Sequence, residues 1–145
     1  MRVVYFGSGE FAVPTLRWLH NSAHELALVV TQPDRPAGRG KKATPTPVAL
    51  RAAMEGLPLE RCGDVNAPTF LERLRGLQAD LGVVAAFGQK LLAPVRSVFR
   101  GECINLHASL LPRWRGAAPI AASILAGDVQ TGVSVFRLVD RMDAG

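Results

Sequence analysis

The sequence has few cysteines and no long apolar run. Its two cysteines, Cys62 and Cys103, are too few and too widely separated for a disulfide framework or a cysteine-rich zinc site, so we expect no structural metal. The longest apolar runs, such as residues 81–87, are far shorter than the ~20 residues that cross a bilayer, which excludes a membrane-spanning helix. Residues 1–7 lead into glycine without the cleavage site of a signal peptide. We therefore expect a cytoplasmic protein.

The composition that is present suits a globular domain. The chain has 145 residues, a length typical of one domain. Hydrophobic residues make up 48% and charged residues 20%, which is enough apolar material for a core and excludes a disordered chain. Lys and Arg outnumber Asp and Glu by 17 to 12, so the formal net charge is +5.

Apolar, β-rich runs alternate with amphipathic segments along the chain. The expected strands are residues 2–6, 26–31, 57–62, 81–87, 102–106 and 131–138, and the expected helices are residues 12–19, 46–56, 70–77, 93–99 and 117–125. This alternation predicts an α/β fold with a doubly wound, mostly parallel open sheet. Ligands of such sheets bind in the crevice beyond the carboxyl ends of the strands, so we expect function in those loops.

A glycine motif follows the first predicted strand. Gly7-Ser8-Gly9-Glu10-Phe11-Ala12 matches the pattern of dinucleotide sites and lies between a strand and a helix. Such sites also need an acid at the end of the second strand, but here that strand ends in Thr31-Gln32-Pro33. We therefore expect no nicotinamide cofactor, and we interpret the glycines as permitting a tight turn.

Residues 32–45 are rich in proline, glycine and cations, and we expect a long exposed loop there. Four of the cations lie close together in the sequence, and they are Arg35, Arg39, Lys41 and Lys42. Such a cluster attracts phosphates, and arginine can bind one through two parallel N–H bonds, so nucleic acid is a candidate partner. The alternative is a solvated charge run without a ligand.

Three polar residues are candidates for proton and oxyanion chemistry. Asn105 and His107 are two residues apart at the end of a predicted strand, so both side chains leave the same face toward the crevice. Histidine can relay protons near neutral pH, and an asparagine amide can stabilise an oxyanion. Asp143, after the last strand, could orient the imidazole. Taken singly, a hydrogen-bonded histidine and a turn aspartate are the plainer alternatives. Ser109 lacks the elbow motif of a serine nucleophile.

Four separated segments resemble the signature of the folate-dependent formyltransferases. They are Asn105-Leu106-His107, Ser109-Leu110-Leu111-Pro112, Arg113-Trp114-Arg115-Gly116-Ala117-Ala118-Pro119 and Asp143-Ala144-Gly145. Residues 32–42 and 45–48 are similar to the tRNA-facing loop of those members that formylate methionyl-tRNA. Members that act on glycinamide ribonucleotide or on sugars lack that loop.

The resemblance implies formyl transfer from 10-formyltetrahydrofolate to the amino group of methionine on initiator tRNA, without a metal or NAD. It implies that Asn105 stabilises the oxyanion, that His107 transfers protons and that Asp143 orients His107. The implied tRNA-binding residues are Arg35, Arg39, Lys41 and Lys42. The implied folate-binding residues are Ser109, Leu110, Leu111, Pro112, Gln89, Lys90, Leu91, Val139, Asp140 and Arg141.

Members of the family continue well past the Asp143-Ala144-Gly145 segment, through the rest of the catalytic domain and into a small β-barrel that helps to hold tRNA. We therefore expect residues 1–145 to be an incomplete catalytic domain, weakly active or inactive alone, without the β-barrel. Two alternatives stay open: a formyltransferase for a small amine, such as an amino sugar or glycinamide ribonucleotide, and a non-catalytic nucleotide- or RNA-binding module. The sequence does not predict the oligomeric state.

Overall fold

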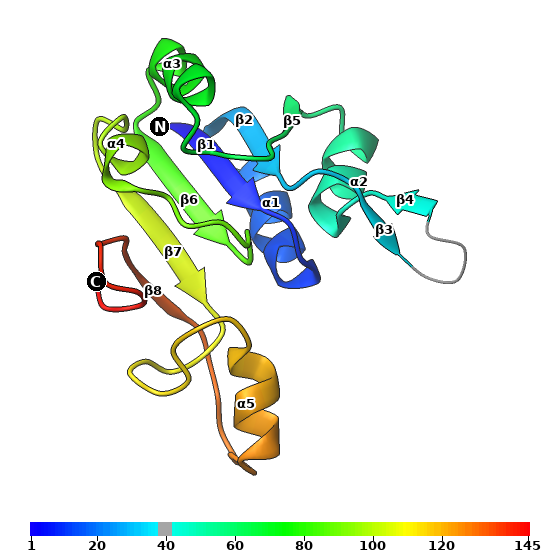
Figure 1. The fold of residues 1–145 in the computed structure, drawn as a ribbon, viewed down its shortest axis with the longest axis vertical. Coiled ribbons are helices and arrows are strands. Elements are labelled where there is room, and N and C mark those ends of the chain that lie inside the picture. Colours follow the sequence, from blue (N-terminus) through cyan, green and yellow to red (C-terminus); the bar gives the residue numbers. More distant parts are fainter. Residues whose placement is uncertain (38–41) are drawn as a thin grey trace.

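A six-stranded sheet with helices on both faces forms the centre of the computed structural model, which describes residues 1–37 and 42–145 (Figure 1). In chain order the elements are β1 (Arg2–Gly7), a 3-10 helix η1 (Glu10–Ala12), α1 (Val13–His20), β2 (Glu25–Thr31), β3 (Arg35–Ala37), β4 (Lys42–Thr44), α2 (Pro47–Met54), β5 (Leu59–Arg61), α3 (Pro68–Leu77), β6 (Leu81–Ala85), α4 (Ala93–Arg96), β7 (Cys103–His107), α5 (Pro119–Leu125) and β8 (Ser134–Arg137). Among these, no helix has the length and apolar character needed to span a membrane.

The strand order confirms the predicted doubly wound sheet. The order is β5-β2-β1-β6-β7-β8, in which β8 pairs antiparallel with β7 and the other neighbours are parallel. The chain winds outward from β1 to β5 in one direction and from β6 to β8 in the other. The winding therefore reverses between β1 and β6, which is where such folds bind ligands.

Two hydrophobic clusters, one on each face of the sheet, hold the layers together. One cluster packs Leu16 of α1 and Val48 of α2 against β1 and β2. The other packs Phe70 of α3 and Val95 of α4 against the opposite side chains of the same strands. The alternation of side chains along a strand delivers apolar groups to both faces.

The exposed loop expected at residues 32–45 contains two short strands that the sequence did not predict. β3 and β4 form an antiparallel pair there, with Arg35 opposite Thr44 and Pro36 opposite Ala43. Proline is tolerated on edge strands, and both strands of a two-stranded pair are edges, so Pro36 is compatible with this pair. Arg39 and Lys41 lie outside the described residues.

Other predicted elements are confirmed with shorter bounds. Thr46 caps α2 as expected, since its hydroxyl accepts a hydrogen bond of 3.0 Å from the Ala49 N–H. The expected strand over residues 81–87 ends at Ala85, because Ala86 has a φ of +43° and turns the chain away from the sheet. The expected helix over residues 93–99 ends at Arg96.

The last helix, α5, lies outside the layers of the sheet. It follows β7 in the chain and extends away from the sheet, before the chain returns to it as β8 (Figure 1). Its apolar side chains are largely solvent-exposed, with Ile124 at 71% and Leu125 at 87% relative exposure. In this way α5 forms one wall of a hollow rather than a layer over the sheet.

Candidate active site

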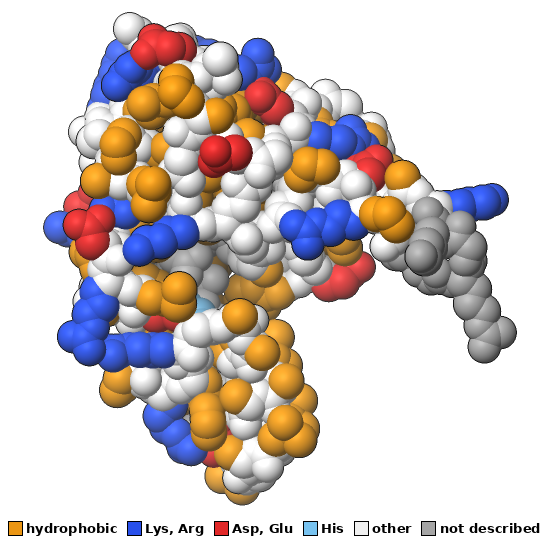
Figure 2. Space-filling model, viewed as in Figure 1, with side chains coloured by type: hydrophobic (Ala, Val, Ile, Leu, Met, Phe, Trp, Pro, Cys, Tyr) orange, Lys and Arg blue, Asp and Glu red, His pale blue; other side chains and the backbone are white. Residues whose placement is uncertain are grey.

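A cavity of about 860 Å³ opens where the winding of the sheet reverses. Its walls come from Phe11 after β1, residues 86–91 after β6, the end of β7, the start of α5 and the residues after β8. Figure 2 shows a hollow between the main body and the lobe that contains α5. The size suits a small organic molecule, since pockets for such ligands occupy roughly 300–1,000 Å³.

The end of β7 carries two of the predicted catalytic residues into this cavity. Asn105 pairs with Val84 of β6 and Phe136 of β8, and His107 pairs with Ser134 of β8. Both side chains line the cavity, as their spacing along the strand predicts. His107 is only 6% exposed, so its ring is held by its surroundings.

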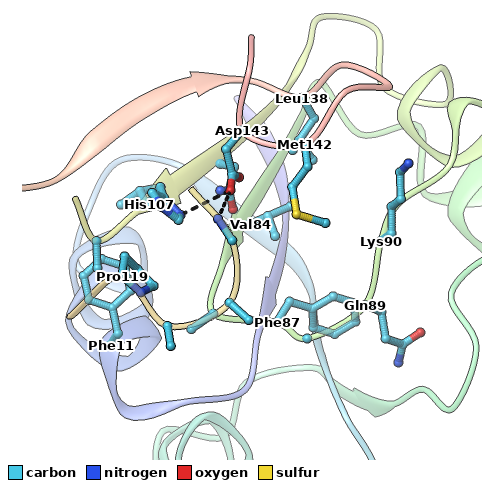
Figure 3. A pocket seen from close by; sticks show the side chains of 18 of the residues that line it. Phe11, Val84, Phe87, Gln89, Lys90, His107, Pro119, Leu138, Met142 and Asp143 are labelled. Atoms are coloured by element: carbon cyan, nitrogen blue, oxygen red, sulfur yellow. Dashed lines mark hydrogen bonds and ion pairs between the residues drawn. The ribbon is translucent and has the colours of Figure 1, made fainter. Parts of the chain in front are cut away.

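Both imidazole nitrogens of His107 face acceptors. Nε2 lies 2.8 Å from the backbone oxygen of Trp114, and Nδ1 lies 3.9 Å from Oδ2 of Asp143. Figure 3 shows the His107 and Asp143 side chains next to each other, joined by a dashed line. The structure thus brings the three predicted catalytic residues to one cavity, although Asp143 is far from the other two in sequence.

A glycine holds the carboxylate of Asp143 in place. The Gly116 N–H donates a hydrogen bond of 2.8 Å to Asp143 Oδ2, and Gly116 adopts a φ of +101° that favours glycine. Positive φ is uncommon for other residues, yet Ala86, Trp114 and Asp143 all adopt it beside this cavity. Such backbone conformations concentrate at ligand sites.

The loop after β6 brings three predicted folate-binding residues to the cavity, and one of them also anchors the loop. Lys90 and Leu91 line the cavity. Gln89 also lines it, but its side-chain amide donates to the Cys62 carbonyl at 2.8 Å and accepts from the Val65 N–H at 3.0 Å. Gln89 therefore links the loop after β6 to the segment that follows β5.

Of the three predicted folate-binding residues after β8, two line the cavity and one forms an ion pair on the surface. Val139 and Arg141 line the cavity, whereas the Asp140 carboxylate pairs with Arg96 on the surface. The hydrogen bond and the positive charge of Arg96 lower the pKa of Asp140. A role of Asp140 in folate binding stays a prediction.

The four predicted folate-binding residues Ser109, Leu110, Leu111 and Pro112 do not line this cavity. Ser109 is fully buried, and its hydroxyl donates to the Arg113 carbonyl at 2.7 Å. The Leu111 N–H donates to the Ser134 hydroxyl at 3.0 Å, which ties the segment to β8. These contacts shape the loop behind His107, and contact with a folate stays a prediction.

The glycine motif after β1 has a packing role. A Cβ on Gly7 would lie 2.8 Å from the Tyr5 ring and 2.9 Å from the Ala12 Cβ, so only glycine fits there. The Ser8 and Gly9 N–H groups, which could otherwise bind a phosphate, donate to the Ala86 carbonyl at 3.2 and 3.1 Å. Both observations favour the interpretation of a tight turn.

The cations of the β3–β4 pair lie apart from the cavity lining. Arg35 and Lys42 are exposed, and the Arg35 guanidinium contacts the Gln32 side-chain oxygen. The pair follows β2, whose carboxyl end lies at the same edge of the parallel sheet as the cavity. In the described part of the chain, no group of three or more His, Cys, Asp and Glu side chains could hold a metal.

Four contributors to the site were not assigned a role from sequence: the Trp114 carbonyl, the Gly116 N–H, Phe11 and Met142. The glycine among small residues at 116–118 was an available signal for a close backbone contact. The carbonyl of Trp114 left no signal, because any residue has one.

Comparison with known proteins shows to which family the chain belongs. The family model described as "Formyl transferase" matches residues 1–145. The chain is 54% identical over 145 residues to a methionyl-tRNA formyltransferase of Methylococcus capsulatus and 50% identical to one of Methylobacillus flagellatus, and it spans 47% of the length of each. A phosphoribosylglycinamide formyltransferase from Bacillus halodurans is similar in fold, with a TM-score of 0.74 and 24% identity over 100% of this chain and 75% of that chain.

The family match covers every segment on which the resemblance was based. It also covers all of the residues that line the cavity, from Phe11 to Asp143. The structural likeness supports the same fold independently of sequence identity. The chain therefore belongs to the formyl transferase family.

Proposed function

We propose that the protein containing this chain transfers a formyl group from 10-formyltetrahydrofolate to the amino group of methionyl-initiator tRNA. The observation that carries the proposal is the meeting of Asn105, His107 and Asp143 in one cavity at the reversal point of the sheet. Residues 1–145 would be the N-terminal part of the catalytic domain, since the chain spans 47% of its relatives' length. The reaction would take place in the cytoplasm, where initiator tRNA is used.

The proposed reaction needs one oxyanion donor and one proton acceptor. The bound folate supplies a formyl group on nitrogen, an amide-like carbon that an amine can attack. The Asn105 amide would donate a hydrogen bond to the formyl oxygen as negative charge develops on it. His107 would accept the proton that the attacking nitrogen loses and return it to the folate nitrogen as that nitrogen leaves. Asp143 would stabilise the imidazolium between these two steps.

The cavity lining fits the chemistry of the donor. Apolar side chains cover much of its wall, including those of Phe11, Phe87, Leu138 and Met142 (Figure 3), and they could cover flat aromatic rings. Lys90 and Arg141 are exposed at the same cavity and would attract the carboxylates of the folate tail. Lys90 lies on the opposite side of the pocket from His107 in Figure 3, which leaves an extended ligand room between them.

The choice of acceptor rests on two observations. Relatives at 54% and 50% identity are methionyl-tRNA formyltransferases. The segment that includes Arg35 and Lys42 adds positive charge at the same sheet edge, which suits the phosphates of an acceptor stem. A small amine as acceptor is the second candidate, but the structurally similar phosphoribosylglycinamide enzyme, at 24% identity, supports only the fold.

A competition assay tests the acceptor. The complete gene product is given 10-formyltetrahydrofolate with equal amounts of methionyl-initiator tRNA, glycinamide ribonucleotide and an amino sugar nucleotide, and the formylated products are quantified. We expect formyl-methionyl-tRNA as the dominant product. Preferential formylation of either small amine would replace the proposal with the second candidate.

A further inference from the structure

We propose that Trp114 and Asp128 act as positioning residues that hold neutral His107 in the tautomer protonated at Nε2, so that Nδ1 is free to take up the proton of the reaction. This inference rests on the proposed function for its catalytic meaning. The tautomer itself is a property of the free protein and can be measured without any substrate.

The first step is the contact at Nε2. The backbone oxygen of Trp114 lies 2.8 Å from Nε2 of His107. A carbonyl oxygen can only accept a hydrogen bond, so the short contact is favourable only when Nε2 carries a hydrogen. Neutral imidazole has a single N–H, and Nδ1 is then left with a lone pair.

The second step is the environment of Nδ1. Its neighbour is the Asp143 carboxylate at 3.9 Å, which already accepts the Gly116 N–H. A carboxylate offers no hydrogen to the Nδ1 lone pair, so this nitrogen is available to an incoming proton. When the attacking amine transfers its proton to Nδ1, the ring becomes an imidazolium with N–H groups facing the Trp114 carbonyl and Asp143. Returning that proton to the leaving folate nitrogen regenerates the starting tautomer.

The third step is what holds the Trp114 carbonyl in place. Trp114 has a φ of +57°, a conformation that a tryptophan adopts only when its surroundings impose it. Its indole N–H donates a hydrogen bond of 2.6 Å to Asp128 Oδ2. Arg113 pairs with the other oxygen of Asp128 at 2.9 Å, and its guanidinium lies over the Trp114 ring at 4.9 Å.

Asp128 links this contact to α5. Its side chain is only 12% exposed, and its N–H donates to the Ser123 carbonyl near the end of the helix. Both carboxylate oxygens are therefore used, one for each of two successive residues. A largely shielded carboxylate with both oxygens hydrogen-bonded is restrained in position, which is what a distant support for an imidazole requires.

The experiment is 15N NMR of the complete gene product labelled at histidine, above the pH at which the imidazole protonates. The His107→Gln variant assigns the signal. We expect wild-type Nε2 protonated and Nδ1 unprotonated. Trp114→Phe keeps the carbonyl but removes the indole donor, and we expect it to mix the tautomers. Asp128→Ala should act similarly, and Asp128→Asn, which keeps an acceptor oxygen, should lie closer to wild type. Glu72→Gln, which changes an exposed side chain of α3, is the matched control.

Trp114→Phe and Asp128→Ala should each lower kcat by about 10- to 100-fold. The KM for either substrate should stay unchanged, because a misplaced group affects chemistry more than binding. A wild-type Nδ1–H tautomer overturns the inference, as does an unaltered tautomer in folded Trp114→Phe and Asp128→Ala. An inactive wild-type protein with the expected tautomer would instead count against the proposed function alone.

Discussion

His107 Nδ1 and Asp143 Oδ2 lie 3.9 Å apart, at the end of β7 and just beyond β8. The two side chains are 7% and 11% exposed, so water screens their interaction only weakly. No hydrogen bond joins them at this distance, and the carboxylate is held by the Gly116 N–H instead. The arrangement leaves a position for a proton between an imidazole and an anion, in a cavity that Asn105 also lines.

Replacing Asp143 by Asn should reduce kcat for formyl transfer by about 10- to 100-fold. The substitution keeps an acceptor for the Gly116 N–H but removes the charge that would stabilise protonated His107. The KM for folate should change little. Steady-state kinetics on the complete gene product measure both constants, and a variant with wild-type kcat would remove Asp143 from the mechanism.

Replacing Arg39 and Lys41 by Ala should weaken tRNA binding and flatten its salt dependence. Each lost phosphate contact reduces the slope of log K against log salt by about 1. Arg75→Ala is the control, since Arg75 is an exposed cation of α3 paired with Glu72. Binding is followed by filter retention of methionyl-tRNA over a salt series. Equal slopes for wild type and the double variant would exclude a phosphate-binding role.

Two glycines should respond oppositely to alanine. A Cβ on Gly82 would lie 2.7 Å from the Phe99 ring and 2.8 Å from Cys103 Sγ, so Gly82→Ala should destabilise the fold by about 1–3 kcal/mol. A Cβ added to Gly76, in α3, would have no atom within 4 Å. Gly76→Ala should therefore stabilise the folded protein by ~0.5–1 kcal/mol. Urea unfolding measures both. A stabilised Gly82→Ala protein would contradict the packing described for β6.

The two thiols should be unreactive in the folded protein. Cys62 and Cys103 are buried, and burial raises the pKa of both, that of Cys103 to about 12. A raised pKa lowers the fraction of nucleophilic thiolate at pH 8. We expect slow modification by an aromatic disulfide reagent until denaturant is added, and then rapid modification of both thiols. Fast reaction of the native protein would show that one of them is accessible.

The sheet and the placement of Asn105 and His107 at the cavity could be predicted because both depend on local patterns. Apolar runs predicted the central strands, and the two-residue spacing of Asn105 and His107 predicted that both face the cavity. The β3–β4 pair could not be predicted, because its strands are only three residues long, β3 contains Pro36, and the side chains of Arg35, Pro36 and residues 42–44 are exposed. The loop of residues 109–112 turns behind His107 through hydrogen bonds that no spacing reveals.

The contact between His107 and Trp114 could not be predicted from the sequence either. It depends on a backbone carbonyl and on a positive φ at a tryptophan, and neither has a residue-type signature. Asp128, which supports that contact, is unremarkable as a turn residue after α5 until its partners are known.

The rate of a single turnover tests the central claim most directly. The complete gene product is mixed with 10-formyltetrahydrofolate and methionyl-initiator tRNA, both saturating, and formyl-methionyl-tRNA is followed over time. Asn105→Ala should slow this step by ~10²–10³ and His107→Ala by ~10²–10⁴, while folate binding stays unchanged. Wild-type rates in both variants would contradict the assignment of this cavity as the site of formyl transfer.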